Sequence, residues 1–219
     1  GDPIEFTKKY YSDGADEILL NDVVASLYER NSLNYVIEKI ASNMFVPITV
    51  SGGIRTVADV ENILKSGADK VGINTAACNN PKLIEEVSMT FGSSCMVLQV
   101  DAKKISNNKW EPYINGGRDR THKDLEEWIK ECDSMGIGEI LLTSIDNEGT
   151  GKGFDVELIE TVAKNSSVPI IISGGLGNYK DLDFLKDMNA ISGIAISNFL
   201  HLKNKNIKSI KDHLKDLFQ

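Results

Sequence analysis

The chain contains an internal repeat, and this repeat restricts the possible folds more than any other feature of the sequence. Residues 46–54 (VPITVSGGI) recur as residues 168–176 (VPIIISGGL), and residues 17–20 (EILL) recur unchanged as residues 139–142. Both matches have the same offset, 122 residues (46 to 168 and 17 to 139). Two independent matches at one offset indicate the duplication of a half-domain.

Short apolar runs alternate with amphipathic segments along the whole chain. Most runs are continuous, which is typical of strands buried on both faces of a parallel sheet. Strand–helix alternation at this spacing predicts right-handed βαβ units, and two halves of four units make an α/β fold, the (β/α)8 TIM barrel. Since no linker divides the chain, we expect one domain over residues 1–219. The expected strands are residues 17–22, 48–51, 70–74, 96–101, 139–146, 169–173 and 193–197, and the expected helices are residues 57–66, 81–90, 123–135, 155–164 and 180–187.

The repeat also reveals a missing strand. The strand expected at residues 96–101 has no counterpart in the first half, because a position 122 residues earlier would precede Gly1. Seven strands cannot close such a barrel without leaving an edge unpaired. We therefore expect that the first strand of the barrel is missing from this chain.

Charge and composition exclude several classes of function. The net charge of −8, from 24 Lys and Arg against 32 Asp and Glu, disfavours a nucleic-acid partner. No apolar run approaches the roughly 20 residues of a membrane-spanning helix, so no membrane is expected. The odd count of three cysteines, without CxxC spacing, indicates free thiols in a reducing, cytoplasmic compartment. The three histidines are scattered, so we expect neither a metal nor a cofactor.

In a barrel of this kind the active site forms at the carboxyl ends of the strands. Two glycine pairs, Gly52-Gly53 and Gly174-Gly175, end strands in the two halves, where backbone N–H groups can approach an anion. They predict two phosphate sites on opposite sides of the mouth, although glycines can also serve only to make tight turns. The other small polar residues that end strands, and that we include in the predicted site, are Asn74, Thr75, Thr143, Ser173, Ser197 and Asn198.

Asp101 ends a strand of apolar residues, where a carboxylate is costly to bury. It is our leading candidate for a general acid or base, and a structural carboxylate bonded to loop amides is the alternative. Asp146 opens a glycine-rich loop that also holds Glu148 and Gly149. Because Asp and Asn favour turns, catalysis and capping are both open for Asp146. Asp22 has the same ambiguity.

Three charged residues, Glu17, Lys70 and Glu139, begin their strands and should lie together at the opposite end of the barrel. Charges at strand starts are usually exposed to solvent, which is one interpretation. The other is a mixed ring of charges that forms a gated opening into the barrel interior.

Four stretches resemble the cyclase subunit of imidazole glycerol phosphate synthase. They are residues 51–77 (SGGIRTVADVENILKSGADKVGINTAA), 99–104 (QVDAKK), 139–155 (EILLTSIDNEGTGKGFD) and 170–177 (IIISGGLG). The resemblance covers nearly the whole chain, and the combination of motifs is specific although no single motif is.

The resemblance implies that a glutaminase partner at the amino-terminal face of the barrel releases ammonia, which passes through the barrel to the mouth. There it attacks a phosphoribulosyl aminoimidazole carboxamide ribotide, a bisphosphate, to give imidazole glycerol phosphate and an aminoimidazole carboxamide ribotide. Of the two aspartates that perform acid–base chemistry in the family, one matches Asp101. The other lies on the first strand, so we expect this chain to be catalytically incomplete.

The resemblance also implies roles for the remaining candidates. Gly53, Asn74 and Thr75 match the residues that hold one phosphate, and Glu17, Lys70 and Glu139 match a charged gate at the ammonia entrance. Two departures stand at the second phosphate: Glu148-Gly149-Thr150 replaces Asp-Gly-Thr, and Ser197-Asn198 replaces Ala-Ser. Their added bulk would crowd that site. The matches to the second phosphate site are Gly149, Gly175, Ser197 and Asn198.

Three other functions stay open. The chain also resembles cyclase-like paralogues that supply ammonia for amidation of cell-surface sugars, partly through residues 22–28 (DVVASLY) and 148–155 (EGTGKGFD). A sister isomerase of the same half-barrel ancestry is less similar at the strand ends. A docking subunit that activates a glutaminase without its own turnover is the alternative without enzymatic activity.

Overall fold

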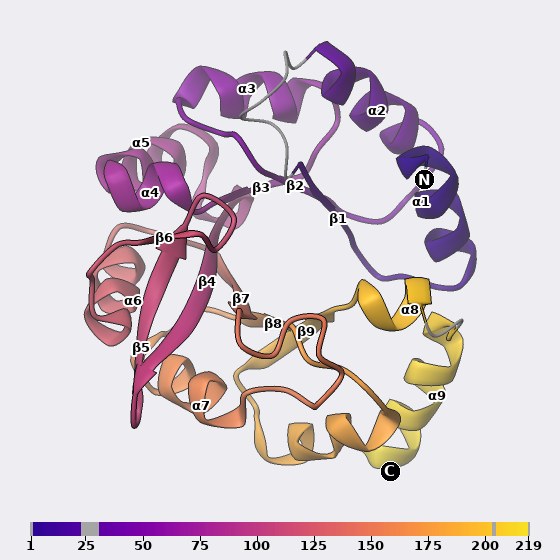
Figure 1. Cartoon of the computed structure of the whole chain (residues 1–219). Coiled ribbons are helices and arrows are strands. Elements are labelled where there is room, and N and C mark those ends of the chain that lie inside the picture. The colour runs from indigo at the N-terminus through magenta and orange to yellow at the C-terminus, as the bar shows by residue number, and fades with distance from the viewer. Residues whose placement is uncertain (1, 23–30, 203–204, 219) are drawn as a thin grey trace.

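The structure, a computed structural model, describes residues 2–22, 31–202 and 205–218. Its strands form one sheet, in which the parallel strands follow the order β1–β2–β3–β4–β7–β8–β9 and curl into a barrel wall (Figure 1). The architecture is the predicted α/β TIM barrel. The parallel strands are β1 (Ile18–Asn21), β2 (Ile48–Ser51), β3 (Lys70–Ile73), β4 (Met96–Ser106), β7 (Glu139–Ser144), β8 (Ile170–Ser173) and β9 (Ile191–Ala195).

Helices surround this sheet on the outside (Figure 1). Their start positions follow capping signals in the sequence: Thr56 and Asp59 form a capping box, and Asp124 and Asp155 accept hydrogen bonds from the first turns of their helices. The helices are α1 (Pro3–Ser12), α2 (Asn31–Ala41), α3 (Val57–Lys65), α4 (Thr75–Asn79), α5 (Lys82–Phe91), α6 (Leu125–Ser134), α7 (Val156–Asn165), α8 (Asn198–Leu202) and α9 (Ile207–Leu217), with 3-10 helices η1 (Ser93–Cys95) and η2 (Tyr179–Asp187).

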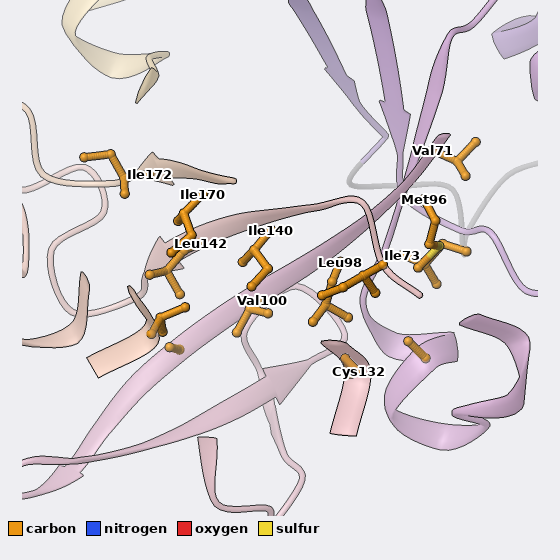
Figure 2. Packing of buried hydrophobic residues seen from close by; sticks show 14 of the residues in the cluster. Val71, Ile73, Met96, Leu98, Val100, Cys132, Ile140, Leu142, Ile170 and Ile172 are labelled. Atoms are coloured by element: carbon orange, nitrogen blue, oxygen red, sulfur yellow. The ribbon is translucent and has the colours of Figure 1, made fainter. Parts of the chain in front are cut away.

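The main core lies between the sheet and the helices. Alternate residues of each strand point outward, and Figure 2 shows Met96, Leu98 and Val100 of β4 beside Ile140 of β7 and Cys132 of α6. These side chains are all essentially inaccessible to solvent. Because successive strand residues point to opposite faces, the intervening residues face the barrel interior. The apolar core therefore fixes which side chains line the axis.

The structure confirms the repeat. Strand β8 lies 122 residues after β2 at both of its ends, and β7 and β9 overlap the positions 122 residues after β1 and β3. The turns after β2 and β8 also match. A Cβ atom added at Gly52 would overlap the carbonyl oxygen of Asp22, and a Cβ atom added at Gly174 would lie 3.0 Å from the carbonyl oxygen of Ser144. These four residues form two pairs at the same offset. Each half therefore makes the same close approach between the backbones of neighbouring strands.

The sheet is open between β1 and β9, which stand at the two ends of the strand order in the described residues. Helices α1 and α8 meet beside this opening. Tyr10 Oη lies 3.0 Å from a ring nitrogen of His201, and the Phe6 ring packs edge-on against the same imidazole. The opening therefore lies next to β1 and β9 at one side of the barrel wall.

Some expectations from the sequence were incomplete or wrong. The strand expected at residues 96–101 is longer: β4 continues to Ser106 and forms an antiparallel hairpin with β5 (Lys109–Ile114), which in turn pairs with β6 (Asp119–Arg120). Residues 180–187 form part of the 3-10 helix η2 rather than an α-helix. Helices α1, α2, α4, α8 and α9 were not predicted. Residues 23–28, which carry part of the resemblance to the sugar-amidating paralogues, lie outside the described residues.

The described part of the chain lacks two kinds of feature. Across the described ranges, no helix combines the length and apolarity needed to span a bilayer. Within the same ranges, no group of three or more His, Cys, Asp or Glu side chains is arranged to hold a metal ion.

The close approach at the first glycine turn predicts a difference between two Gly→Ala variants. Gly52 (φ +96°) and Gly14 (φ +92°) both have left-handed backbones, but no described atom lies within 4 Å of a side chain at Gly14. We expect Gly14→Ala to cost about 1 kcal/mol of unfolding free energy, from backbone strain alone. Gly52→Ala should cost about 3 kcal/mol, because the new methyl also displaces Asp22. Urea denaturation measures both, and equal losses would show that the contact with Asp22 is not present.

Candidate active site at the barrel mouth

One cavity of about 1560 Å³ extends along the barrel axis and out through the gap between β1 and β9, where Phe6, Tyr10 and His201 line it. Glu17 and Glu139 line it at the amino ends of the strands, and Asp101 lines it at the carboxyl ends. Between them the lining comes from inward-facing strand residues, among them Gln99 and Leu141. The charged residues of one end and the candidate catalytic carboxylate of the other therefore border a single continuous space.

Asp101 stands on β4 at the mouth of this cavity. Its backbone is fixed on both sides, since it pairs with Thr143 of β7 and with Tyr113 of β5. One carboxylate oxygen accepts a hydrogen bond from Asn74 Nδ2 at 3.0 Å. The same Asn74 amide donates its other hydrogen to the Tyr113 carbonyl oxygen, also at 3.0 Å. Asn74 therefore holds the carboxylate at a fixed position at the mouth.

The surroundings of Asp101 raise its pKa to about 6. Burial is the main cause, because it disfavours the charged form, and the negative charge of Glu148 adds to it. Hydrogen bonds from Gln99 and Asn74 act in the opposite direction but are outweighed. A carboxyl group with a pKa near 6 exists in both protonation states close to neutral pH, which suits a group that both takes and gives protons.

The first predicted phosphate site opens onto the cavity. Gly52 and Gly53 both have positive φ, and together with Asn74 and Thr75 they line the mouth. The Thr75 hydroxyl accepts a hydrogen bond from the backbone N–H of Asn115 at 3.0 Å. Because both amide hydrogens of Asn74 are already used, a ligand here meets the Thr75 hydroxyl and the glycine backbone rather than the Asn74 side chain.

The second predicted site is different, because the loop after β7 packs onto it. Gly153 N–H donates to the Gly175 carbonyl oxygen at 2.8 Å. Asn198 Nδ2 lies 3.4 Å from the carbonyl oxygen of Gly149, so two residues assigned to this site contact each other. Asp146 accepts a hydrogen bond from the backbone N–H of Lys104 at 2.8 Å, which fastens the loop to β4.

The predicted charged cluster is formed at the opposite end of the barrel. Lys70 Nζ lies 2.8 Å from Oε2 of both Glu17 and Glu139, and Glu17 also accepts a hydrogen bond from the Thr49 hydroxyl. All three charged side chains are largely buried, with 14–25% of each exposed. Burial acts to lower the pKa of Lys70, but its hydrogen bonds to the two glutamates outweigh burial and raise it. The lysine is therefore fully charged.

Most predicted site residues border the cavity. Asp146, Gly149, Gly174, Gly175 and Asn198 are not part of the cavity lining in the described residues. Lys70 contacts the lining through its two glutamates. Those that line the mouth are Gly52, Gly53, Asn74, Thr75, Asp101, Thr143, Glu148, Ser173 and Ser197, and Glu17 and Glu139 line the other end.

Sequence reasoning missed the loop at residues 115–118, which lines the mouth from the hairpin side. Its Asn115-Gly116-Gly117 run is a turn signal, and it separates two short segments with strand character, WEPYI and DRT. That signal was available in the sequence. It was overlooked because a β4 of ordinary length would end at Asp101.

The raised pKa of Asp101 predicts a pH-dependent effect of Asp101→Asn on stability. In the unfolded chain this carboxyl group titrates near its ordinary value, about 4, so between pH 4 and 6 the folded state binds more protons than the unfolded state. Its ionisation therefore opposes folding increasingly as the pH rises from about 4 to about 6, and by a constant amount above that. We expect Asp101→Asn to raise the unfolding free energy by about 2 kcal/mol at pH 7 and by almost nothing at pH 4. A variant that is destabilised equally at both pH values would contradict this.

Comparisons with known proteins agree with this geometry. A family model described as "Histidine biosynthesis protein" matches residues 1–206. An "Imidazole glycerol phosphate synthase subunit HisF" from Legionella pneumophila is 49% identical over 84% of this chain and 86% of its own length. HisF subunits from Helicobacter hepaticus and Bacillus cereus are 47% and 43% identical, each over 99% of this chain and 85% and 86% of their own lengths. By this match and these identities, the chain belongs to the histidine biosynthesis protein family.

Proposed function

We propose that this protein is the cyclase subunit of imidazole glycerol phosphate synthase. Ammonia from a glutaminase partner attacks a phosphoribulosyl aminoimidazole carboxamide ribotide, and the products are imidazole glycerol phosphate and an aminoimidazole carboxamide ribotide. The observation that carries the proposal is the single cavity that joins the Glu17–Lys70–Glu139 cluster to Asp101. This arrangement suits a reaction in which a small neutral reagent enters at one end of a barrel and reacts at the other.

Asp101 acts as a general acid–base at the mouth. A nitrogen nucleophile must lose protons as it forms new bonds, and the leaving nitrogen must gain one. With a pKa of about 6, Asp101 can accept a proton from the first and return it to the second. Asn74 is a positioning residue, because its amide holds the Asp101 carboxylate and the hairpin carbonyl of Tyr113 together.

The substrate carries a phosphate at each end, and each half of the barrel supplies one site. The first consists of the turn at Gly52-Gly53 and the Thr75 hydroxyl, which face the cavity. The second lies at Ser173 and Ser197, beneath the loop that packs on Gly175. Backbone N–H groups and hydroxyls bind a phosphate without a basic patch, which explains how a chain with a net charge of −8 takes such a substrate.

The glutaminase docks at the amino-terminal face, around the charged cluster. This face carries two exposed apolar side chains: Phe45 in the loop before β2 is 90% exposed, and Met89 near the end of α5 is 81% exposed. Exposed large apolar residues near a polar opening are typical of a protein interface. We place the reaction in the cytoplasm, which agrees with the three cysteines being buried free thiols.

A second candidate function is the supply of ammonia for amidation of a phosphate-bearing sugar or nucleotide. Glu148 favours it, because its negative charge faces Asp101 at the mouth and would repel a phosphate at the second site. If this function is correct, the protein binds the histidine-pathway bisphosphate weakly even at high ammonium concentration.

The first test is ammonium-dependent turnover by the full-length protein with the bisphosphate, with products identified by mass spectrometry. We expect both imidazole glycerol phosphate and the carboxamide ribotide to form. Asp101→Asn should lower kcat about 10²- to 10⁴-fold, the usual contribution of a general acid–base. Glu160→Gln, on the outer helix α7, is the matched control and should leave kcat unchanged. Tight binding of a glutaminase without any product would refute the cyclase and support a docking subunit.

The second test concerns the charged cluster. Lys70→Met leaves Glu17 and Glu139 facing each other without a cation, which disrupts the opening on the glutaminase side. We expect glutamine-dependent turnover to fall several-fold more than ammonium-dependent turnover, because free ammonia also reaches Asp101 from the mouth. Lys65→Met, on the surface of α3, serves as control and should change neither rate. If Lys70→Met lowers both rates equally, the cluster does not control ammonia entry.

A further inference from the structure

We propose that Arg118, in the loop between β5 and β6, binds the substrate phosphate at the Gly53–Thr75 site and completes that site with a positive charge. The inference rests on the proposed function, because it takes the phosphate of the cyclase substrate as its ligand. It adds a residue that the resemblance does not supply, on an element that the sequence did not predict.

The course of the hairpin places Arg118 at the mouth. Strand β5 runs back along β4, so the loop after it returns toward β3 and α4 (Figure 1). Asn115, Gly116 and Gly117 have φ values of 54°, 70° and 76°, and these three left-handed residues reverse the chain. Arg118 N–H then donates to the Ile114 carbonyl oxygen at 3.1 Å, which closes the turn. The loop and Arg118 both line the cavity.

The loop is bonded directly to the first phosphate site. The N–H of Asn115, three residues before Arg118, donates to the Thr75 hydroxyl at 3.0 Å. A hydroxyl has one donor and two acceptor positions, so Thr75 accepts this bond and keeps its own hydrogen for a phosphate oxygen. Asn74 is bonded to Tyr113 of the same strand. The hairpin and the phosphate site therefore keep a fixed separation.

The two arginines of the hairpin, Arg118 and Arg120, differ in their partners. Glu111 is only 2% exposed and accepts hydrogen bonds from Arg120 Nη2 at 2.7 Å and Nε at 3.1 Å. The His122 N–H donates to the other Glu111 oxygen at 2.6 Å. Arg120 thus has a structural partner. Arg118 is exposed, and in the described part of the chain it has no ion pair that would hold its guanidinium away from a ligand.

The charged side chains that line the cavity are mostly acidic, so a cation there favours the binding of an anionic substrate. The described lining contains six carboxylates, Asp16, Glu17, Asp22, Asp101, Glu139 and Glu148, but Arg55 and Arg118 are its only lysine or arginine side chains. Of these carboxylates, Asp22, Asp101 and Glu148 lie at the carboxyl ends of the strands, so a bisphosphate that enters the mouth meets three acidic side chains and two arginines. A guanidinium on the loop that is bonded to Thr75 offsets the repulsion from these carboxylates and can bind two phosphate oxygens at once. Arg55 follows Gly53 by two residues, and its backbone N–H is bonded to Asp59 of α3, whereas the loop that carries Arg118 is bonded to Thr75.

The test compares kinetics of Arg118→Ala with those of the wild type in the ammonium assay. Arg118 is distant from the reacting atoms in its assigned role, so it contributes equally to ground-state and transition-state binding. We expect KM for the bisphosphate to rise about tenfold, with kcat unchanged. Arg118→Lys, which keeps the charge but not the fork of donors, should raise KM by less. Lys109→Ala removes the same charge from the exposed start of β5 and should leave KM unchanged.

A direct binding measurement separates this inference from the proposed function. Glycerol phosphate is titrated into wild type and Arg118→Ala and followed by calorimetry at low and high salt. We expect the variant to bind about tenfold more weakly at low salt and to lose most of the salt dependence. An unchanged KM and an unchanged affinity for glycerol phosphate overturn the role of Arg118, whatever the wild-type turnover. Absence of turnover in the wild type, with weaker glycerol phosphate binding by Arg118→Ala, refutes the cyclase and supports the anion site.

Discussion

The two-residue alternation of the parallel strands is the constraint on which the site depends. Lys70 begins β3 and Asn74 follows its end, four residues apart, so both face the barrel axis. Glu139 and Thr143 have the same relation on β7. The outward-facing residues between them are apolar and pack against the helices, which locks the register. A shift of one residue in any strand would move the polar groups into the apolar core. Core packing therefore places the charged cluster and the mouth on one axis.

The two halves share a backbone but differ in the loops that cover their glycine turns. Both glycine turns make the same close approach to the neighbouring strand, at Asp22 and Ser144. In the first half the turn stays open to the cavity. In the second half, the loop after β7 packs on Gly175. The second half also begins with β4, which carries Asp101 and extends into the hairpin. The duplication thus supplies the two proposed anion sites, and their surroundings differ: the loop that carries Arg118 is bonded to Thr75 of the first, and the loop that carries Glu148 packs on Gly175 of the second.

The sequence predicted the barrel, the seven parallel strands, and the placement of Glu17 and Lys70 at one end and Asp101 at the other, because repeats and apolar runs depend on local order. It did not predict that β4 continues to Ser106, since the residues after Asp101 are polar and their pairing with β5 is a tertiary contact. It also did not predict that both amide hydrogens of Asn74 are used within the protein, because such bonds depend on distances between segments far apart in the chain. Roles assigned by motif matching therefore need the geometry of side-chain partners.

The central claim is that Asp101 is a buried carboxyl group at the mouth whose pKa is matched to proton transfer near neutral pH. Its surroundings are polar enough to hold it in place through Asn74 but dry enough to favour the protonated form. The most direct measurement is an NMR titration of the Asp101 side-chain carboxyl carbon in the full-length protein, assigned with Asp101→Asn. This account predicts a midpoint near pH 6. A midpoint at or below about 4, the value of a solvated aspartate, would contradict it.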